Sequence, residues 1–390
     1  MKTILSLILA FGLIFSSAAA ENLTGEALVN PVPVPLLCPS AILIEPESGQ
    51  IIFEMDADEK RPVASVTKIM AILLACEALE EGRAKADDIV TVSKTAAGMG
   101  GSQVLLDVGE VQPFHVLLKS MIVGSANDAT VAMGEYLYGS HPLFVDRMNE
   151  RAKELGCTDT HFVNSTGLPA EGHYTTARDL ALIAREAMSH ERFREIVSTR
   201  RATIPWEGRS YQRILNNKNR LLTEYSGATG IKTGYTKAAG RCLVFGAKRD
   251  GMEVIGVVLH CGNWFEEAAR LMDEGFERYE MFPVLEAGET VRVLPVNGGK
   301  QETVCVLSGG RLAAPVRKGT VPVLEYDLPE TVEAGGEEGS KVGEARMIIQ
   351  GEVAVRIPLV LGQSLAKRDY GFEVERMLRN WPSVPQVMAE

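Results

Sequence analysis

Residues 65–78 read Ser65-Val-Thr-Lys68-Ile-Met-Ala-Ile-Leu-Leu-Ala-Cys-Glu-Ala78. This run is rich in good helix formers, and Gly82 just beyond it suits a helix C-terminus. The pattern predicts a helix that begins at Ser65 and carries Lys68 one turn further on. Because residues three apart share a helix face, the Lys68 amine can reach the Ser65 hydroxyl.

This serine–lysine pair predicts nucleophilic catalysis. A serine hydroxyl is a poor nucleophile until an adjacent base removes its proton. A free lysine has a pKa of about 10.4, so holding Lys68 neutral at pH 7 costs roughly 4.6 kcal/mol. The apolar helix and a second cation, such as Lys232, can supply that shift. The pattern recurs at Ser364-Leu-Ala-Lys367 with no partner motif downstream, and we interpret that second match as a chance occurrence.

A second motif, Ser125-Ala-Asn127, forms a polar break between two apolar, helix-like segments. A serine at such a break can relay a proton to a leaving amine. An asparagine amide can both donate and accept hydrogen bonds. Taken alone, the motif fits a plain helix N-cap equally well.

A third motif, Lys232-Thr-Gly234 followed by Tyr235, precedes two β-rich runs that are separated by Arg249-Asp-Gly-Met252. That separator is a hairpin signal, so we expect the motif on a strand paired with the hairpin. Lys232 and Thr233 can then hold a carboxylate, and Gly234 lets a substrate backbone approach closely. Taken alone, the motif also fits a strand-end lysine beside a turn glycine.

In this order and spacing, the three motifs resemble the low-molecular-mass serine D-alanyl-D-alanine carboxypeptidases, a class of penicillin-binding proteins. Residues 101–110 and 149–176 share the resemblance, which spans roughly residues 38–282. It implies removal of the terminal D-alanine from peptidoglycan stem pentapeptides through an acyl-enzyme on Ser65. It also implies that β-lactam antibiotics are covalent inhibitors, and that no cofactor or metal is needed.

The resemblance also assigns roles to residues. Ser65 would be the nucleophile and Lys68 the general base, while Ser125 would relay protons and Asn127 would orient the substrate. Substrate binding would fall to Lys232, Thr233, Gly234 and Tyr235, with the backbone N–H groups of Ser65 and Tyr235 forming the oxyanion hole. One departure is that residues 259–265 lack the arginine with which several relatives help to hold the substrate carboxylate. We therefore expect that carboxylate to depend more heavily on Lys232 and Thr233.

Composition and the N-terminal segment predict an exported protein that acts at the cell surface or on the periplasmic side. Residues 1–20 have the lysine, short apolar core and Ala18–Ala20 end of a signal peptide. The formal net charge of −11, with no basic run, argues against a nucleic-acid partner. The histidines and cysteines show no metal-ligand spacing. The six scattered cysteines predict no disulfide framework, although Cys242 and Cys261 fall nearly opposite each other across the 249–252 turn, and that pairing stays open.

The fold class expected is α+β: one antiparallel sheet flanked by helices, five-stranded by the family resemblance, followed by a small all-β domain. The expected parts are a signal peptide (1–20), an extended lead-in (21–40), a catalytic domain (41–282), a β-sandwich (283–366) and an amphipathic tail (367–390). The tail's apolar face fits either peripheral membrane contact or docking on the chain's own domain.

Two other classes of function stay open from the sequence. A class A-like β-lactamase shares the three motifs, but it needs a deacylating glutamate roughly 40 residues after the second one. Residues 161–168 carry no glutamate. A non-catalytic cell-wall scaffold with the same fold is the other alternative, and the intact Ser65, Lys68, Asn127 and Lys232 argue against it.

Overall fold

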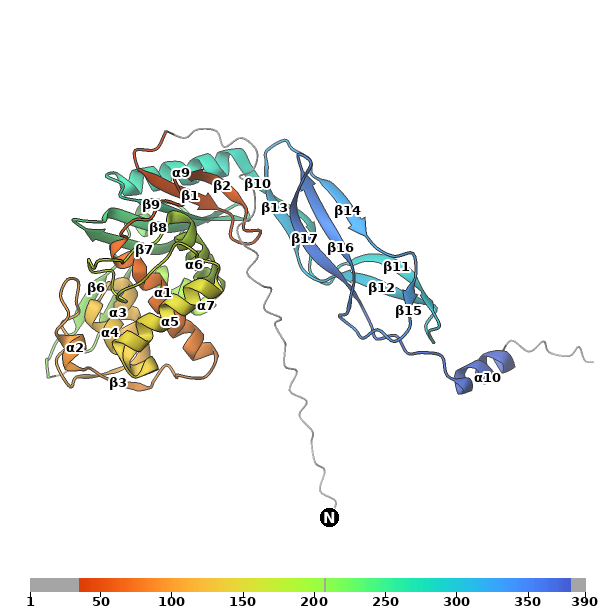
Figure 1. The fold of residues 1–390 in the computed structure, drawn as a ribbon, viewed down its shortest axis with the longest axis horizontal. Coiled ribbons are helices and arrows are strands. Elements are labelled where there is room, and N and C mark those ends of the chain that lie inside the picture. Colours follow the sequence, from red (N-terminus) through yellow and green to blue (C-terminus); the bar gives the residue numbers. More distant parts are fainter. Residues whose placement is uncertain (1–34, 207, 380–390) are drawn as a thin grey trace, which may run out of the picture.

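The computed structural model describes residues 35–206 and 208–379. The predicted signal peptide and most of the lead-in lie outside the described residues, as does the end of the tail. Figure 1 shows a mixed α/β body joined to an elongated β-rich part, with a short helix at the far end. Within the described ranges, none of the helices combines the length and apolarity that a membrane span requires.

The α/β body is built on a five-stranded sheet, in which every pairing is antiparallel. Its strand order is β2-β1-β9-β8-β7, so β7 lies at one edge. The hairpin predicted at 249–252 joins β8 to β9. The expected fold class is thus confirmed. The strands are β1 (Ser40–Ile44), β2 (Ile51–Met55), β7 (Ala228–Thr236), β8 (Gly240–Arg249) and β9 (Met252–Leu259).

Helices cover both faces of this sheet (Figure 1). Helix α9 (Trp264–Arg278) packs on β8 and β9 from one side, and the larger helical group lies on the other. That group consists of η1 (Ala64–Thr67), α1 (Lys68–Glu80), α2 (Lys94–Ala97), α3 (Phe114–Val123), α4 (Asn127–Tyr138), α5 (His141–Glu154), α6 (Ala177–Ser189) and α7 (Glu191–Val197). The short helix α8 (Leu221–Glu224) lies on the α9 side, where Leu221 belongs to the same core as α9. Two small hairpins complete the body: β3 (Ile89–Thr91) with β4 (Val111–Pro113), and β5 (Arg201–Ile204) with β6 (Arg213–Asn216).

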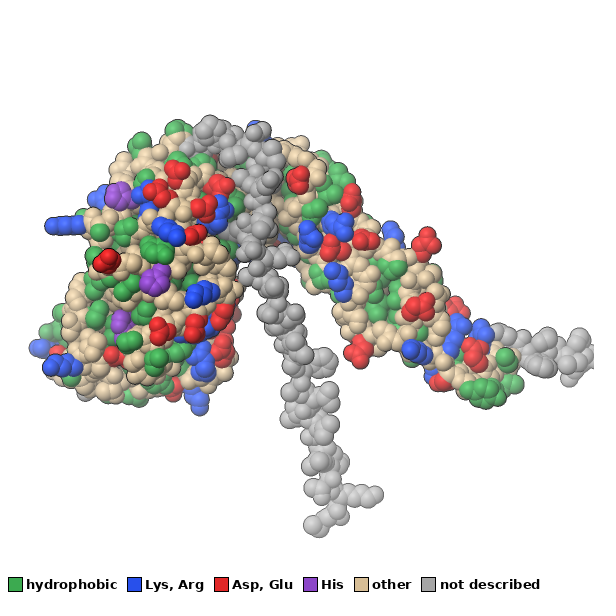
Figure 2. All heavy atoms as spheres, viewed as in Figure 1, with side chains coloured by type: hydrophobic (Ala, Val, Ile, Leu, Met, Phe, Trp, Pro, Cys, Tyr) green, Lys and Arg blue, Asp and Glu red, His purple; other side chains and the backbone are tan. Residues whose placement is uncertain are grey.

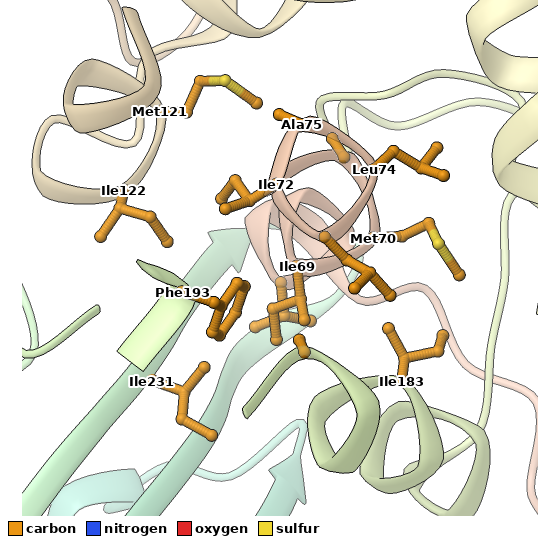
Figure 3. Close-up of a cluster of buried hydrophobic side chains, with 14 of the residues drawn as sticks. Ile69, Met70, Ile72, Leu74, Ala75, Met121, Ile122, Ile183, Phe193 and Ile231 are labelled. Atoms are coloured by element: carbon orange, nitrogen blue, oxygen red, sulfur yellow. The ribbon is translucent and has the colours of Figure 1, made fainter. Parts of the chain in front are cut away.

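Helix α1 runs through the centre of the helical group and is buried from Lys68 to Ala78. A helix that is apolar on all sides must be surrounded by other elements, and Figure 3 shows those neighbours. Ser65 is therefore fixed at the end of a close-packed helix. The labelled side chains are Ile69, Met70, Ile72, Leu74 and Ala75 of α1, Met121 and Ile122 of α3, Ile183 of α6, Phe193 of α7 and Ile231 of β7.

The region after α9 is all-β, as expected. A two-stranded sheet packs against a six-stranded one, ordered β14-β16-β17-β12-β11-β15, around a separate apolar core. The first strand begins at Tyr279, ahead of the boundary expected at 283, and the domain limits stay a prediction. The strands are β10 (Tyr279–Leu285), β11 (Thr290–Asn297), β12 (Thr303–Ser308), β13 (Leu312–Arg317), β14 (Val323–Asp327), β15 (Val332–Glu333), β16 (Lys341–Ile349) and β17 (Glu352–Leu361).

The surface and the last helix agree with the sequence pattern. On the face drawn in Figure 2, acidic and basic side chains are interspersed over both parts of the molecule. The helix expected in the tail is α10 (Tyr370–Arg379), none of whose residues is buried. Its apolar side chains are therefore left facing solvent in this structure.

Candidate active site

The predicted nucleophile and base lie side by side. Ser65 belongs to the 3-10 turn η1, which leads directly into α1 at Lys68. Lys68 Nζ donates a hydrogen bond to Ser65 Oγ at 3.1 Å and another to the carbonyl oxygen of Thr166 at 2.7 Å. The Lys68 side chain is fully buried. Its amine is thereby fixed against the hydroxyl that it would deprotonate.

The surroundings of Lys68 disfavour its charged form. Burial is the largest cause, and the positive charges of Lys232 and Lys218 add to it; together they hold the pKa of Lys68 well below its ordinary value. A neutral amine can accept a proton, whereas an ammonium cannot. The environment thus supplies the shift that a lysine base requires.

The second motif occupies the turn between α3 and α4. Ser125 has a positive φ of 54° and is nearly buried, and its Oγ accepts a hydrogen bond from Lys232 Nζ at 2.9 Å. Asn127 Nδ2 donates to the carbonyl of Gly100 at 2.6 Å. Asn127 Oδ1 is buried and has no partner in the structure. A free buried acceptor at this position suits an incoming substrate N–H.

The third motif lies on the edge strand β7, as expected. Burial and then the charge of Lys218 lower the pKa of Lys232 to about 7. A Cβ on Gly234 would lie 2.9 Å from the backbone nitrogen of Ser65 and 3.0 Å from that of Val66. Only glycine lets β7 approach the nucleophile turn this closely. Tyr235, the next residue along β7, is 63% exposed.

A cavity of about 410 Å³ lies beside Ser65, between the start of η1, the 167–174 loop and the end of β7. None of the side chains that line it is acidic. The lining residues are Lys60, Arg61, Pro62, Val63, Ala64, Gly167, Leu168, Pro169, Ala170, Gly172, His173, Tyr174, Thr236 and Ala238.

Sequence reasoning missed three residues of the site. Thr166 contributes only its carbonyl, which no side-chain pattern reveals, and Gly167 allows its loop to pass against the backbone of Ala64. Lys218, from the loop before α8, donates to Ser102 Oγ at 3.3 Å and acts electrostatically on both site lysines. A lone lysine in a polar loop carries no signal of such a role.

The second serine–lysine match and one cluster of potential metal ligands lie away from this site. Ser364 is exposed in the β-rich part, where its Oγ accepts from the backbone N–H of Glu338. Within residues 35–206 and 208–379, Glu77, Glu186 and His190 place potential metal-ligand atoms within 4.8 Å of one another. The Arg151 guanidinium already donates to both of those carboxylates. A guanidinium there supplies the positive charge that a metal would bring.

The open pairing of Cys242 with Cys261 is not favoured by the strand register. Leu243 pairs with Val258 across β8 and β9, which places Cys242 opposite Leu259 rather than Cys261. The Cys242 thiol instead donates to the carbonyl of Ala239 at 3.5 Å. The two cysteines are thus near each other across the predicted turn but two residues from direct opposition.

A serine hydroxyl beside a buried lysine of lowered pKa is the arrangement that serine acyl transfer requires, and comparison with known proteins agrees. The family model described as D-alanyl-D-alanine carboxypeptidase matches residues 30–263. The chain is 34% identical over 348 residues to D-alanyl-D-alanine carboxypeptidase DacF of Bacillus subtilis, covering 88% of this chain and 89% of that protein.

Solved structures show the same likeness. Penicillin-binding protein 5 from Haemophilus influenzae matches with a TM-score of 0.76 and 26% identity, over 86% of this chain and 99% of that one. A Streptomyces DD-transpeptidase matches with a TM-score of 0.57 and 31% identity, over 62% of this chain and 98% of that one.

The chain belongs to the D-alanyl-D-alanine carboxypeptidase family. It is a serine hydrolase of the penicillin-binding class, and its family works on peptidoglycan. The family expected from the three motifs is confirmed, and the β-lactamase and scaffold alternatives are not supported.

Proposed function

We propose that Ser65 is the nucleophile and Lys68 the general base in removal of the terminal D-alanine from peptidoglycan stem pentapeptides. The observation that carries this assignment is the 3.1 Å contact between Lys68 Nζ and Ser65 Oγ, made by an amine whose pKa is held low by burial and two neighbouring cations. A base must first be within hydrogen-bond reach, and its pKa then decides whether it is neutral.

The acylation step follows from this contact. Lys68 removes the Ser65 proton while Ser65 Oγ attacks the carbonyl of the penultimate D-alanine. The peptide C–N bond breaks, and Ser125 passes a proton to the departing amine. Water then hydrolyses the ester on Ser65. A β-lactam acylates Ser65 in the same way, but its amine stays tethered to the acyl group, so the adduct persists.

The position of β7 predicts which way the substrate peptide runs through the site. As the edge strand, β7 has one side free to accept a peptide in an extended conformation. Lys232 and Thr233 precede Gly234, which lies against Ser65, and Thr236 follows it at the cavity. The leaving D-alanine then points toward Lys232, and the acyl part of the stem peptide points into the 410 Å³ cavity.

The positive charge around Lys232 supports its proposed role in binding the terminal carboxylate of the substrate. Lys232 and Thr233 would hold that group together with Lys218, which the sequence analysis did not identify. Lys218 would supply positive charge in place of the arginine that residues 259–265 lack. A bound carboxylate restores the positive charge on Lys232, whose pKa of about 7 in the free protein leaves it partly neutral. The backbone N–H groups of Ser65 and Tyr235 would stabilise the oxyanion, with Gly234 allowing the close approach. Asn127 Oδ1 would accept a hydrogen bond from a substrate amide N–H.

We also propose export and peripheral membrane contact. The signal-peptide pattern of residues 1–20 supports export. Helix α10 exposes Tyr370, Met377 and Leu378 by 87%, 63% and 68%, which supports contact with a membrane surface. The mature protein should sediment with phosphatidylglycerol-containing vesicles, and a form ending at residue 369 should not. Equal sedimentation of the two forms would exclude the helix as the anchor.

The activity itself is tested with a pentapeptide that ends in D-Ala-D-Ala. We expect release of free D-alanine, measured with D-amino-acid oxidase, together with the shortened peptide by mass spectrometry. The likeness to a DD-transpeptidase gives the contrasting outcome. Cross-linked dimers without net hydrolysis to the shortened peptide would assign transpeptidation and refute the hydrolytic proposal. The Ser65→Ala variant provides the blank for both products.

A further inference from the structure

Two cysteines meet at the point where the lead-in joins the sheet. Strand β1 pairs with β9 in antiparallel register, with Ala41 opposite Val258 and Ser40 opposite Leu259. Two residues beyond this last pair, Cys38 and Cys261 lie just outside the two strands, and their side chains meet in the core beneath α9. Paired antiparallel strands hold flanking residues near the Cβ separation that a disulfide requires.

The thiols themselves are neighbours. Cys38 is 5% exposed and Cys261 is fully buried, and both belong to the core beneath α9. A hydrogen bond between the two side chains raises the pKa of Cys38 and lowers that of Cys261. Cys261 is therefore the thiol that ionises first, and the thiolate is the reactive form.

The other four cysteines have different surroundings, although all six lie in the described part of the chain. Cys76 is buried inside α1, Cys157 and Cys242 donate to backbone carbonyls, and Cys305 is exposed on β12. The register thus singles out one pair.

We propose that Cys38 and Cys261 form a disulfide in the exported protein, closing nearly the whole catalytic body into one covalent loop. The inference rests on the proposed export, because disulfides persist in oxidising compartments outside the cytoplasm. All six thiols are reduced in the structure. The disulfide would therefore form by oxidation of these two thiols in the folded protein.

The oxidant is an external disulfide, either of a small thiol or of a thiol oxidoreductase. The Cys261 thiolate attacks one of its sulfur atoms, which releases one thiolate and leaves a mixed disulfide. The Cys38 thiolate then attacks the Cys261 sulfur and releases the second. The two cysteines lose two electrons and two protons, and the external disulfide becomes two thiols.

The bridge would fix two segments that the structure holds by weaker contacts. On the lead-in side, the Leu37 N–H donates to Glu267 of α9 at 3.3 Å. On the other side, the Cys261 N–H donates to the carbonyl of Arg241 at 2.8 Å, and Arg241 is the β8 partner of Tyr235. The disulfide would thus anchor the turn behind the site strand without touching Ser65.

The test uses the mature protein carrying Cys305→Ser, which removes the exposed thiol. The protein is incubated natively with oxidised glutathione, then denatured and alkylated with iodoacetamide with or without prior reduction. We expect two cysteines to escape alkylation until reduction, and an unreduced peptide map to link Cys38 to Cys261. Complete alkylation without reduction, or a link between Cys242 and Cys261, would overturn the proposal.

Two matched variants in that background sharpen the result. With Cys38→Ser, no two cysteines should become linked, and any protection should be a mixed disulfide of Cys261 with glutathione, whereas Cys242→Ser should still protect Cys38 and Cys261 as a linked pair. Benzylpenicillin labelling of Ser65 verifies that each variant is folded. The oxidised parent should melt on the order of 5–10 °C above its reduced form, and the Cys38→Ser variant should show no such difference. A cysteine–cysteine link that survives Cys38→Ser would place the bridge elsewhere.

Discussion

Lys68 Nζ donates to the backbone carbonyl of Thr166 at 2.7 Å, across 98 residues of sequence. This contact uses one of the amine's bonding directions, while the contact with Ser65 uses another. The loop that carries Thr166 is itself held by Asn164 Oδ1, which accepts from the backbone N–H groups of Thr166 and Gly167 at 3.1 and 2.8 Å. The base is thus oriented by a loop as well as by its own helix.

The nucleophile assignment predicts the site of penicillin labelling. We expect Ser65→Ala to abolish covalent labelling by benzylpenicillin, because the attacking oxygen is gone, and Ser364→Ala to leave it unchanged. Intact-mass analysis followed by peptide mapping measures both. An adduct at any residue other than Ser65 in the parent protein would refute the assignment.

Lys232 should matter most for substrates that carry a free carboxylate. A charge-assisted hydrogen bond contributes roughly 1.5–3 kcal/mol, so Lys232→Gln should lower kcat/KM at least about tenfold on a peptide ending in D-Ala-D-Ala. On the same peptide amidated at its C-terminus the loss should be smaller. Equal losses on the two peptides would mean that Lys232 acts only by depressing the pKa of Lys68.

Lys218 should set the pH at which the base becomes active. Burial first, and then the charges of Lys232 and Lys218, lower the pKa of Lys68. Removing one cation in Lys218→Gln stabilises the ammonium form, so the pKa of Lys68 rises. The ascending limb of kcat/KM should then move to higher pH.

The pH profile is measured with the uncharged, amidated peptide, so that loss of carboxylate binding does not interfere. Lys119→Gln serves as the control, because Lys119 is an exposed lysine on α3 that does not contribute to either shift. An ascending limb at the parent's position in Lys218→Gln would remove Lys218 from the electrostatic account of the site.

Gly167 should be essential for the geometry of the nucleophile turn. A Cβ there would collide with the carbonyl of Ala64 and lie 2.9 Å from the backbone nitrogen of Ser65. Gly167→Ala should therefore slow acylation by benzylpenicillin by more than about tenfold, since misplacing reacting groups by about 1 Å can cost as much as 10²-fold.

Gly139→Ala is the matched control for that change. Gly139, at the end of α4 and outside the cavity, has nearly the same φ, 80° against 78° for Gly167, and a Cβ there would meet no atom within 4 Å. Both variants carry the same left-handed strain of roughly 1 kcal/mol, so a stability difference alone cannot separate them. Similar acylation rates in the two variants would show that the close approach of Gly167 is unimportant.

The site was largely predictable because its side chains are carried by short local patterns. Ser65 and Lys68 are three residues apart at the start of α1, and Lys232, Thr233 and Gly234 are consecutive on β7. Local propensity places such residues on a helix or a strand before any tertiary contact forms. The order of the three motifs then supplied the family.

The parts that escaped prediction depend on contacts between distant segments. Lys218 and Thr166 act through position alone, one by its charge and the other by its carbonyl. The contact between Cys38 and Cys261 was not predicted because only the 249–252 hairpin was considered, whereas the two side chains meet through the pairing of β1 with β9. Nothing near Cys38 in the sequence identifies its partner strand.

The sequence by itself determined the chemistry available to this protein: a serine nucleophile, a lysine beside it, and a lysine–threonine–glycine strand. Helix periodicity and strand propensity are local properties, so they can be read from consecutive residues. Only the tertiary structure decided that Lys68 is suited to act as the proposed base, because its pKa depends on burial and on the charges of Lys232 and Lys218. Those effects arise from distances through space, which packing sets and sequence spacing does not.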